Sequence, residues 1–267
     1  MHKASFSVSA IVPVFNEAKT VTRVVEVLLE NPLISEVICI NDGSTDHSLL
    51  RLKKFKNKIK LISFKKNKGK GYALVAGIKK AKSEIVTFID ADLINLSDKH
   101  LTTLLSPILE KEFKAVIGYP SNGWTPNIFT DLTGERAYYR NDLLPYLDEM
   151  ATTKFGVEIF LNSLFSKKET KKLALKQLRG LYKYEKCNAA DAFKGYLNEA
   201  IEIALAIGKK EGLLKKDYQA ISQISKVANL KELKLRIKDI ANKNVRQFLE
   251  KYVLNYAKIL EEKWKNF

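Results

Sequence analysis

The chain has 267 residues, 46% of them hydrophobic and 28% charged, a composition that favours a globular protein over a disordered or fibrous one. Its net charge of +16 implies an anionic partner. No stretch approaches 18 consecutive apolar residues, and the N-terminus runs directly into a strand pattern, so we expect a cytoplasmic protein without a spanning helix. The cysteines, Cys39 and Cys187, fit a reducing compartment.

The first 118 residues alternate strand and helix patterns. Strands are predicted over 7–15, 37–42, 59–64, 85–90 and 115–118, with helices after Asn16, over about 70–81 and after Ser97. Asn16 and Ser97 are the predicted helix caps. This alternation favours an α/β fold with a mainly parallel central sheet, helices on both faces and ligands at the carboxyl ends of the strands.

The pattern changes beyond residue 118. Residues 119–135 are rich in turn formers and are predicted to form a long loop, while 171–181 is compatible with a strand. From about residue 188 the pattern is helical, and one apolar face runs through 245–267. We therefore expect one domain over 1–187, with halves 1–118 and 119–187, followed by a basic helical C-terminal extension over 188–267.

The positive charge is concentrated towards the C-terminus. Residues 151–267 hold 25 Lys and Arg against 13 Asp and Glu, a balance of +12, whereas residues 1–150 hold 21 against 17. No basic run with interleaved aromatic residues stands out, so nucleic acid is not the expected partner. An anionic membrane surface or a phosphorylated acceptor is favoured, with a lysine-rich solvated surface as the structural alternative. The apolar face of 245–267 is expected to pack on the protein itself rather than on a membrane.

The most informative motif is Asp90-Ala91-Asp92, which closes an apolar run. Two carboxylates at the end of a buried strand are costly unless a positive group lies beside them. In an extended chain their side chains project to the same side. Hard oxygen ligands suit Mg²⁺ or Mn²⁺, and a nucleoside diphosphate would complete the coordination shell. The sequence thus predicts a metal site at Asp90 and Asp92.

Two further segments, NDGSTD at 41–46 and NKGKG at 67–71, also follow predicted strands. The carboxylate of Asp42 can accept a hydrogen bond from a base N–H. Gly69 and Gly71 let the backbone approach a phosphate, and Lys70 supplies a point charge. Taken singly, each segment is equally a turn or a helix start. The glycine spacing matches neither a Walker loop nor a dinucleotide fingerprint, which disfavours ATP and nicotinamide chemistry.

Taken in order, VPVFNEA at 12–18, NDGSTD, NKGKG and DAD resemble the nucleotide-sugar-binding half of family-2 glycosyltransferases and their GT-A-fold relatives. The resemblance covers about residues 1–118 and implies a GT-A fold. It implies a nucleoside pocket lined by Pro13, Phe15 and Glu17, a base contact from Asp42, and aspartates that meet the ribose and the metal. The implied nucleotide-sugar contacts are Pro13, Phe15, Glu17, Asp42, Gly69, Lys70, Asp90 and Ala91, with Asp90 and Asp92 as metal ligands.

Two later segments, TGERAYYR at 133–140 and FGVEIFL at 155–161, resemble more loosely the acceptor side of particular relatives. These are polyprenyl-phosphate sugar transferases and glucosyl- or mannosyl-3-phosphoglycerate synthases. The resemblance implies that Arg136 or Arg140 holds an acceptor phosphate near Gly134, since the planar guanidinium fork suits phosphate. It also implies that Glu158 faces the acceptor or the sugar. An ion pair between Glu158 and a lysine is the structural alternative.

The chain departs from this pattern in two places. A metal-coordinating histidine of several relatives has no counterpart in GLYKYEK at 180–186, and none of His2, His47 and His100 is assigned to metal. Asn95 or water is expected to complete the shell, since magnesium commonly keeps waters. The arginine–threonine pattern expected for phosphoglycerate binding also has no close match.

The sequence predicts a metal-dependent transferase that moves a hexose from a UDP- or GDP-linked sugar to a phosphate-bearing acceptor, with a polyprenyl phosphate favoured. Asp92, Lys70 and Glu158 are the catalytic candidates, because the cation and Lys70 would stabilise the departing diphosphate. An ionised phosphate acceptor needs no general base, whereas a hydroxyl acceptor would need one, such as Glu158 or Asp131. The alternatives are transfer to a soluble phosphorylated acceptor, or a silent nucleotide-sugar-binding scaffold. A lipid acceptor would place the protein peripherally on the inner face of the membrane.

Overall fold

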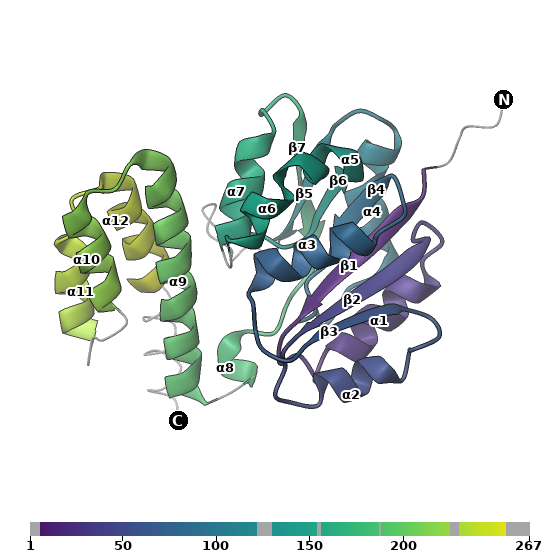
Figure 1. Cartoon of the computed structure of the whole chain (residues 1–267), viewed down its shortest axis with the longest axis horizontal. Coiled ribbons are helices and arrows are strands. Elements are labelled where there is room, and N and C mark those ends of the chain that lie inside the picture. The colour runs from purple at the N-terminus through teal and green to yellow at the C-terminus, as the bar shows by residue number, and fades with distance from the viewer. Residues whose placement is uncertain (1–5, 122–129, 154–155, 187, 225–229, 255–267) are drawn as a thin grey trace. The chain divides into compact units, whose positions relative to one another are not determined.

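The computed structural model describes residues 6–121, 130–153, 156–186, 188–224 and 230–254 (Figure 1). The chain divides into two compact units, residues 1–180 and 181–267. The domain boundary predicted after residue 187 falls within the second unit.

The first unit is built on a seven-stranded sheet with the order β3-β2-β1-β4-β6-β5-β7. Neighbouring strands from β3 to β4 pair in parallel, as do β5 and β7, whereas β6 is antiparallel to both of its neighbours. The predicted mainly parallel α/β sheet is therefore confirmed. The strands are β1 (Val8–Val14), β2 (Glu36–Asp42), β3 (Lys60–Phe64), β4 (Ile85–Phe88), β5 (Ala115–Ser121), β6 (Arg136–Tyr139) and β7 (Thr170–Lys176).

Helices alternate with these strands along the first unit and make up most of the described second unit (Figure 1). Those of the first unit are α1 (Val21–Glu30), α2 (Ser48–Lys53), α3 (Lys70–Lys80), α4 (Asp98–Leu109), α5 (Arg140–Leu143), the 3₁₀ turn η2 (Leu144–Tyr146), α6 (Leu147–Ala151) and α7 (Val157–Leu164). Those of the second are α8 (Lys183–Lys186), α9 (Ala189–Glu211), α10 (Lys215–Ile224), α11 (Leu230–Lys238), α12 (Lys243–Leu249) and the π-helical turn η4 (Glu250–Leu254).

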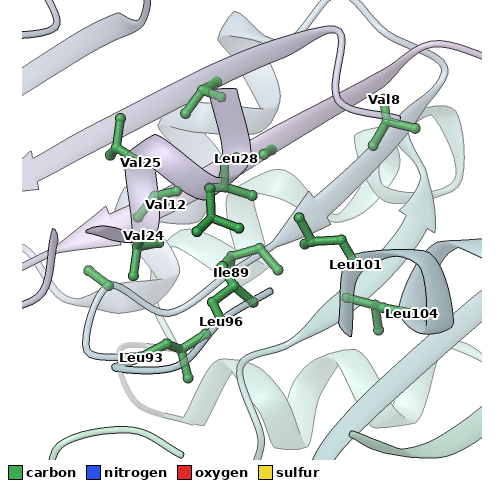
Figure 2. Close-up of a cluster of buried hydrophobic side chains, with 14 of the residues drawn as sticks. Val8, Val12, Val24, Val25, Leu28, Ile89, Leu93, Leu96, Leu101 and Leu104 are labelled. Carbon is green, nitrogen blue, oxygen red and sulfur yellow. The ribbon is translucent and has the colours of Figure 1, made fainter. Parts of the chain in front are cut away.

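Each face of the sheet buries its own apolar cluster, because successive side chains of a strand point to opposite faces. In β2, Ile38 and Ile40 join the cluster that contains α3, while Val37 and Cys39 join the cluster that contains α1 and α4. Burial raises the pKa of the Cys39 thiol to about 12, which fits the packing role predicted for it. Figure 2 shows the second cluster, where Val8, Val12 and Ile89 meet Val24, Val25, Leu28, Leu93, Leu96, Leu101 and Leu104.

This topology collects the ends of several strands at one edge. The parallel strands β1 to β4 all finish there. Because β6 runs antiparallel to β4, with Phe88 opposite Arg136, β6 begins at the same edge. Ligands of open α/β sheets bind at the carboxyl ends of the strands, so residues just before β6 lie close to the aspartates that follow β4.

Two predicted boundaries differ from the structure. Asn16 does not cap α1, which begins at Val21 with Thr20 in the N-cap position. Strand β5 continues through Ser121, paired with β7, so the first residues of the predicted loop over 119–135 are strand instead. Residues 122–129 of that loop lie outside the described residues. Ser97 does occupy the predicted N-cap position of α4, with its hydroxyl 3.0 Å from Nδ1 of His100.

The second unit buries apolar side chains of α9 to α12. Val245, Leu249, Tyr252 and Val253 are all buried, and Tyr252 packs against the rings of Tyr196 and Phe248 at 5.6 and 5.1 Å between centroids. The described part of the predicted apolar face at 245–267 thus packs within the protein, while 255–267 lies outside the described residues. No helix in the described ranges is both long and apolar enough to cross a membrane.

Candidate functional site

Three sequence motifs are tied together at the carboxyl edge of the sheet by hydrogen bonds between loops. Asn16, just after β1, has φ 59° and turns its side-chain oxygen to the loop after β2. That oxygen accepts hydrogen bonds from the backbone N–H groups of Thr45 (2.8 Å) and Asp46 (3.3 Å). The carboxylate of Asp46 accepts one from the backbone N–H of Ala18 at 3.0 Å. The residue predicted to cap a helix therefore fixes the NDGSTD loop.

Asp42 joins this edge to the glycine-rich loop before α3. Its two carboxylate oxygens accept hydrogen bonds from the backbone N–H groups of Lys68 (2.8 Å) and Gly69 (2.9 Å). Burial raises the pKa of Asp42, although these two bonds oppose the change. Gly43 has φ +71° and its Cα lies against the backbone of Lys66, so a side chain would not fit. Asp42, predicted to bind a base, thus has a structural task in holding the loop that carries Lys70.

The other predicted nucleoside contacts lie along the end of β1. Pro13 is half-buried within the strand, opposite Ile40. Phe15 is 42% exposed, and the backbone N–H of Glu17 donates to the hydroxyl of Ser48 at 2.8 Å. A large aromatic ring left open at the carboxyl edge is a surface on which a base can stack. The role predicted for these three residues remains a prediction.

The structure brings Lys70, Asp90 and Glu158 into direct contact. The ammonium nitrogen of Lys70, the first residue of α3, lies 2.7 Å from a carboxylate oxygen of Asp90 and 2.7 Å from one of Glu158 on α7. Burial disfavours the charge on Lys70, but the two carboxylates outweigh it and raise its pKa. The ammonium keeps a third N–H beyond these two contacts. The ion pair considered as the structural alternative for Glu158 is therefore present.

The carboxylates around Lys70 outnumber it. Glu135, which precedes β6, is only 3% exposed. Burial and the nearby charge of Asp90 raise its pKa to about 8, although Lys70 opposes that rise. Burial also raises the pKa of Glu158, against the opposing charges of Lys70 and Arg136. Glutamates whose pKa is raised in this way beside a pair of aspartates mark an excess of negative charge that a cation would relieve.

Two glycines lie against the aspartates. Gly134 is so close to the carboxylate of Asp90 that a Cβ there would overlap it, and a Cβ on Gly180 would lie 3.0 Å from Oδ1 of Asp92. Gly180 is held there by a β-bridge with Leu93. The glycines thus allow the backbone to approach both carboxylates closely. The carboxylate oxygens are donors of the kind that Mg²⁺ and Mn²⁺ prefer, so the residues fit a divalent cation.

The protein donors for such a cation are few. Within the described ranges, no group of three or more His, Cys, Asp and Glu side chains is arranged to hold a metal. Asn95, predicted as a further ligand, is engaged instead: its oxygen accepts from the backbone N–H of Arg179 at 2.8 Å and its amide donates to the carbonyl of Gln177. A cation here would therefore rely on Asp90, Asp92, water and its nucleotide.

The predicted acceptor arginines are both used elsewhere. Arg136 is 1% exposed, and its guanidinium donates to the carbonyl oxygens of Thr133 (2.7 Å) and Asp131 (2.8 Å) and to the side-chain oxygen of Asn162 (2.7 Å). Arg140 follows β6 at the opposite edge of the sheet, where Nε of its guanidinium donates to the carbonyl of Ile78 at 3.0 Å. Both guanidinium groups are therefore engaged in hydrogen bonds within the protein, and the phosphate-binding role predicted for either arginine remains a prediction.

Sequence reasoning missed Glu135 and Gly180. Glu135 stands beside the Gly134 that had been singled out, but the strand β6 that follows it was not predicted. Gly180 had no sequence signal either, since its approach to Asp92 depends on a bridge between distant segments. Ala91, predicted to contact the nucleotide sugar, is 3% exposed and packs in the core, and its contact remains a prediction.

Solved structures with the same arrangement of sheet and helices define the class of fold. Glucosyl-3-phosphoglycerate synthase from Mycobacterium tuberculosis, in complex with Mn²⁺, UDP and glucosyl-3-phosphoglycerate, matches with a TM-score of 0.63 and 22% identity over 80% of this chain and 83% of that one. The first unit thus has the GT-A fold. The family model described as glycosyl transferase family 2 matches residues 9–172, and the chain belongs to that family.

Curated relatives match less than half of the chain. Dodecaprenyl-phosphate galacturonate synthase of Rhizobium johnstonii is 29% identical over 126 residues, which is 44% of this chain and 37% of that protein. Glucosyl-3-phosphoglycerate synthase of Mycolicibacterium smegmatis is 32% identical over 114 residues, 40% of this chain and 38% of that protein. The chain thus spans well under half the length of these relatives.

Proposed function

We propose that this protein is a metal-dependent glycosyltransferase that moves a hexose from a UDP- or GDP-linked sugar to a phosphate-bearing acceptor. The observation that carries the proposal is the pair Asp90 and Asp92 beyond β4, with Gly134 and Gly180 packed against their carboxylates. This leaves two hard oxygen donors at the ligand-binding edge of an α/β sheet. Solved relatives of the same fold carry Mn²⁺ or Mg²⁺ together with UDP, which supports the choice of cofactor.

Each group near the aspartates has a proposed task. Asp90 and Asp92 would hold the cation, which when bound neutralises charge on the diphosphate. Lys70, kept charged by its carboxylate partners, would donate its remaining N–H to the leaving diphosphate. Glu158, on the other side of Lys70, would orient that ammonium and accept from a sugar or acceptor hydroxyl. The nucleoside would lie along Pro13, Phe15 and Glu17, over the loop that Asp42 holds.

The acceptor is proposed to carry a phosphate. The names of both curated relatives contain a phosphate-bearing molecule, a dodecaprenyl phosphate in one and a 3-phosphoglycerate in the other. We propose Arg179 as the cation for this phosphate, because it directly precedes the Gly180 that packs on Asp92. We favour a polyprenyl phosphate met at an anionic membrane surface, because the chain carries a large excess of basic residues in 151–267.

A soluble acceptor of the phosphoglycerate type is the second candidate. The match to glucosyl-3-phosphoglycerate synthase over 80% of the chain favours it. The two candidate acceptors can be distinguished by whether transfer requires a membrane surface, since only a lipid acceptor does.

The test compares donor turnover in the wild type and in Asp92→Asn. We expect Mn²⁺-dependent release of UDP or GDP from the matching hexose donor by the wild type, and its loss with a chelator. Loss of an outer-shell metal partner typically lowers activity by up to about a hundredfold. Asp92→Asn should lower turnover by more than this, because it removes the charge of a direct metal ligand. Circular dichroism should be unchanged, since Asp92 is only half-buried.

Asp98→Asn is the matched control. It also removes a nearby carboxylate, but that of an exposed residue at the start of α4 which accepts from Asn31 at 2.8 Å. It should keep full turnover. Wild-type turnover in Asp92→Asn would remove the metal assignment, and a wild type that binds a nucleotide sugar without turnover or transfer would identify a silent scaffold instead.

A further inference from the structure

Arg136 is buried, and hydrogen bonds from its guanidinium join two segments near the candidate site. Four hydrogen bonds leave its guanidinium: three reach the carbonyls of Asp131 and Thr133 and the side chain of Asn162, and the fourth reaches the hydroxyl of Tyr138 at 3.2 Å. The side-chain amide of Asn162 donates to the same Asp131 carbonyl at 2.7 Å. We call the contacts among Arg136, Asn162 and the carbonyls of Asp131 and Thr133 the Arg136–Asn162 clamp.

One end of the clamp reaches Glu158. Asn162 lies four residues after Glu158 in α7, and residues at this spacing share a helix face. Glu158 in turn lies 2.7 Å from the ammonium of Lys70. A helix held by Asn162 therefore presents Glu158 to Lys70 in one orientation.

The other end reaches Asp90. The clamp fixes the carbonyls at 131 and 133, directly before the Gly134 whose Cα lies against the Asp90 carboxylate. Asp90 also contacts Lys70, at 2.7 Å. The contacts close a ring that runs from Asp90 through Lys70, Glu158, the clamp and Gly134 back to Asp90.

We propose that the Arg136–Asn162 clamp positions the candidate metal site, by fixing Glu158 against Lys70 and Gly134 against Asp90. Arg136 and Asn162 are then positioning residues that touch neither donor nor acceptor. The consequence for metal binding rests on the proposed function, whereas the consequence for Lys70 rests on the ring of contacts alone. Outer-shell partners of this kind typically change metal affinity by about 10- to 100-fold.

The test uses the full chain and compares Asn162→Ala with Tyr138→Phe. Asn162→Ala removes both Asn162 contacts of the clamp. Tyr138→Phe removes another hydrogen bond of the same guanidinium but leaves α7 and the 131–134 segment untouched, so it is the matched control. Two readouts are measured: the rate at which an amine-reactive acetylating reagent modifies Lys70, read by mass spectrometry, and the affinity for Mn²⁺ alone. Lys60, which is ion-paired with Glu36, serves as the internal reference for acetylation.

We expect Asn162→Ala to raise acetylation of Lys70 several-fold relative to Lys60 and to weaken Mn²⁺ binding about tenfold, with Tyr138→Phe unchanged in both. If Asn162→Ala does not fold, Asn162→Asp replaces it, because it keeps the acceptor for Arg136, loses the donor to Asp131 and turns a carboxylate oxygen against the Asp131 carbonyl.

Unchanged Lys70 acetylation in the folded variant overturns the proposal, and so does an equal increase in Tyr138→Phe. If Lys70 responds as expected but the wild type binds no Mn²⁺, the clamp stands and the proposed function fails.

Discussion

Glu135 has an environment that its sequence position does not indicate. It belongs to a polar run before β6, yet it is 3% exposed and has a pKa of about 8. Its pKa in an unfolded chain is near 4.5. At a pH between these two pKa values, Glu135 is protonated in the folded protein and ionised in the unfolded chain. The stabilisation linked to this proton is complete below the unfolded-state pKa and is lost as the pH rises through the folded-state pKa.

We predict that Glu135→Gln removes this pH dependence in metal-free protein. The variant should match the wild type at about pH 5 and exceed it at about pH 9 by an amount on the order of a few kcal/mol, since one pKa unit corresponds to about 1.4 kcal/mol. Denaturant unfolding at both pH values with a chelator present measures the difference.

Glu110→Gln, at an exposed position after α4, is the control and should leave the pH profile unchanged. Parallel profiles for wild type and Glu135→Gln would show that Glu135 titrates as an ordinary surface carboxyl.

At the scale of elements, the loops at the carboxyl edge depend on one another. Asn16, after β1, fixes the loop after β2, and Asp42, which ends β2, fixes the loop that starts α3. Motifs that resemble ligand contacts thus also hold each other in place. This order at the sheet edge is what lets Lys70 meet carboxylates from two other elements.

We predict that Asn16→Gly lowers the free energy of unfolding by about 1–2 kcal/mol, because the hydrogen bonds to Thr45 and Asp46 are lost while φ 59° stays accessible. Asn16→Ala should cost about 1 kcal/mol more, since alanine is strained in the left-handed region. Urea unfolding of the two variants gives both values. A glycine variant as stable as the wild type would mean that the loop does not need the side chain.

At the scale of the whole molecule, the second unit carries exposed basic residues that suit an anionic surface. On α11, Lys231, Lys234 and Lys238 are exposed beside Leu235, which is 56% exposed. The buried face that contains Tyr252 is not available for such contact. We therefore assign the proposed membrane contact to the outer face of α11.

We predict that the protein sediments with phosphatidylglycerol vesicles but not with phosphatidylcholine vesicles, and that high salt releases it. Changing Lys231, Lys234 and Lys238 together to glutamine should weaken binding about a hundredfold, at about 1 kcal/mol for each lysine. The control changes Lys53, Lys54 and Lys56, exposed at the end of α2, in the same way.

A wild type that ignores anionic vesicles at low salt, yet glycosylates a soluble phosphorylated acceptor, would contradict the membrane assignment and select the soluble candidate. Binding that instead requires nucleic acid would redirect the basic face to another partner.

The sequence by itself determined the alternation of strands and helices, the position of Asp90 and Asp92 beyond a buried strand, and the helical character of the C-terminal unit. Each of these follows from local periodicity or from the order of residues next to a strand end. The sequence also offered an ion pair between Glu158 and a lysine as an alternative role for Glu158, and the structure shows that this lysine is Lys70.

Only the tertiary structure decided which polar residues face the site. Arg136 is enclosed because Asn162 and the 131–133 carbonyls surround it, and Arg140 is remote because β6 runs antiparallel to β4. Asn95 pairs with a segment 84 residues away rather than with a metal. Such outcomes depend on strand direction and on packing between distant segments, which a local pattern of residues does not encode.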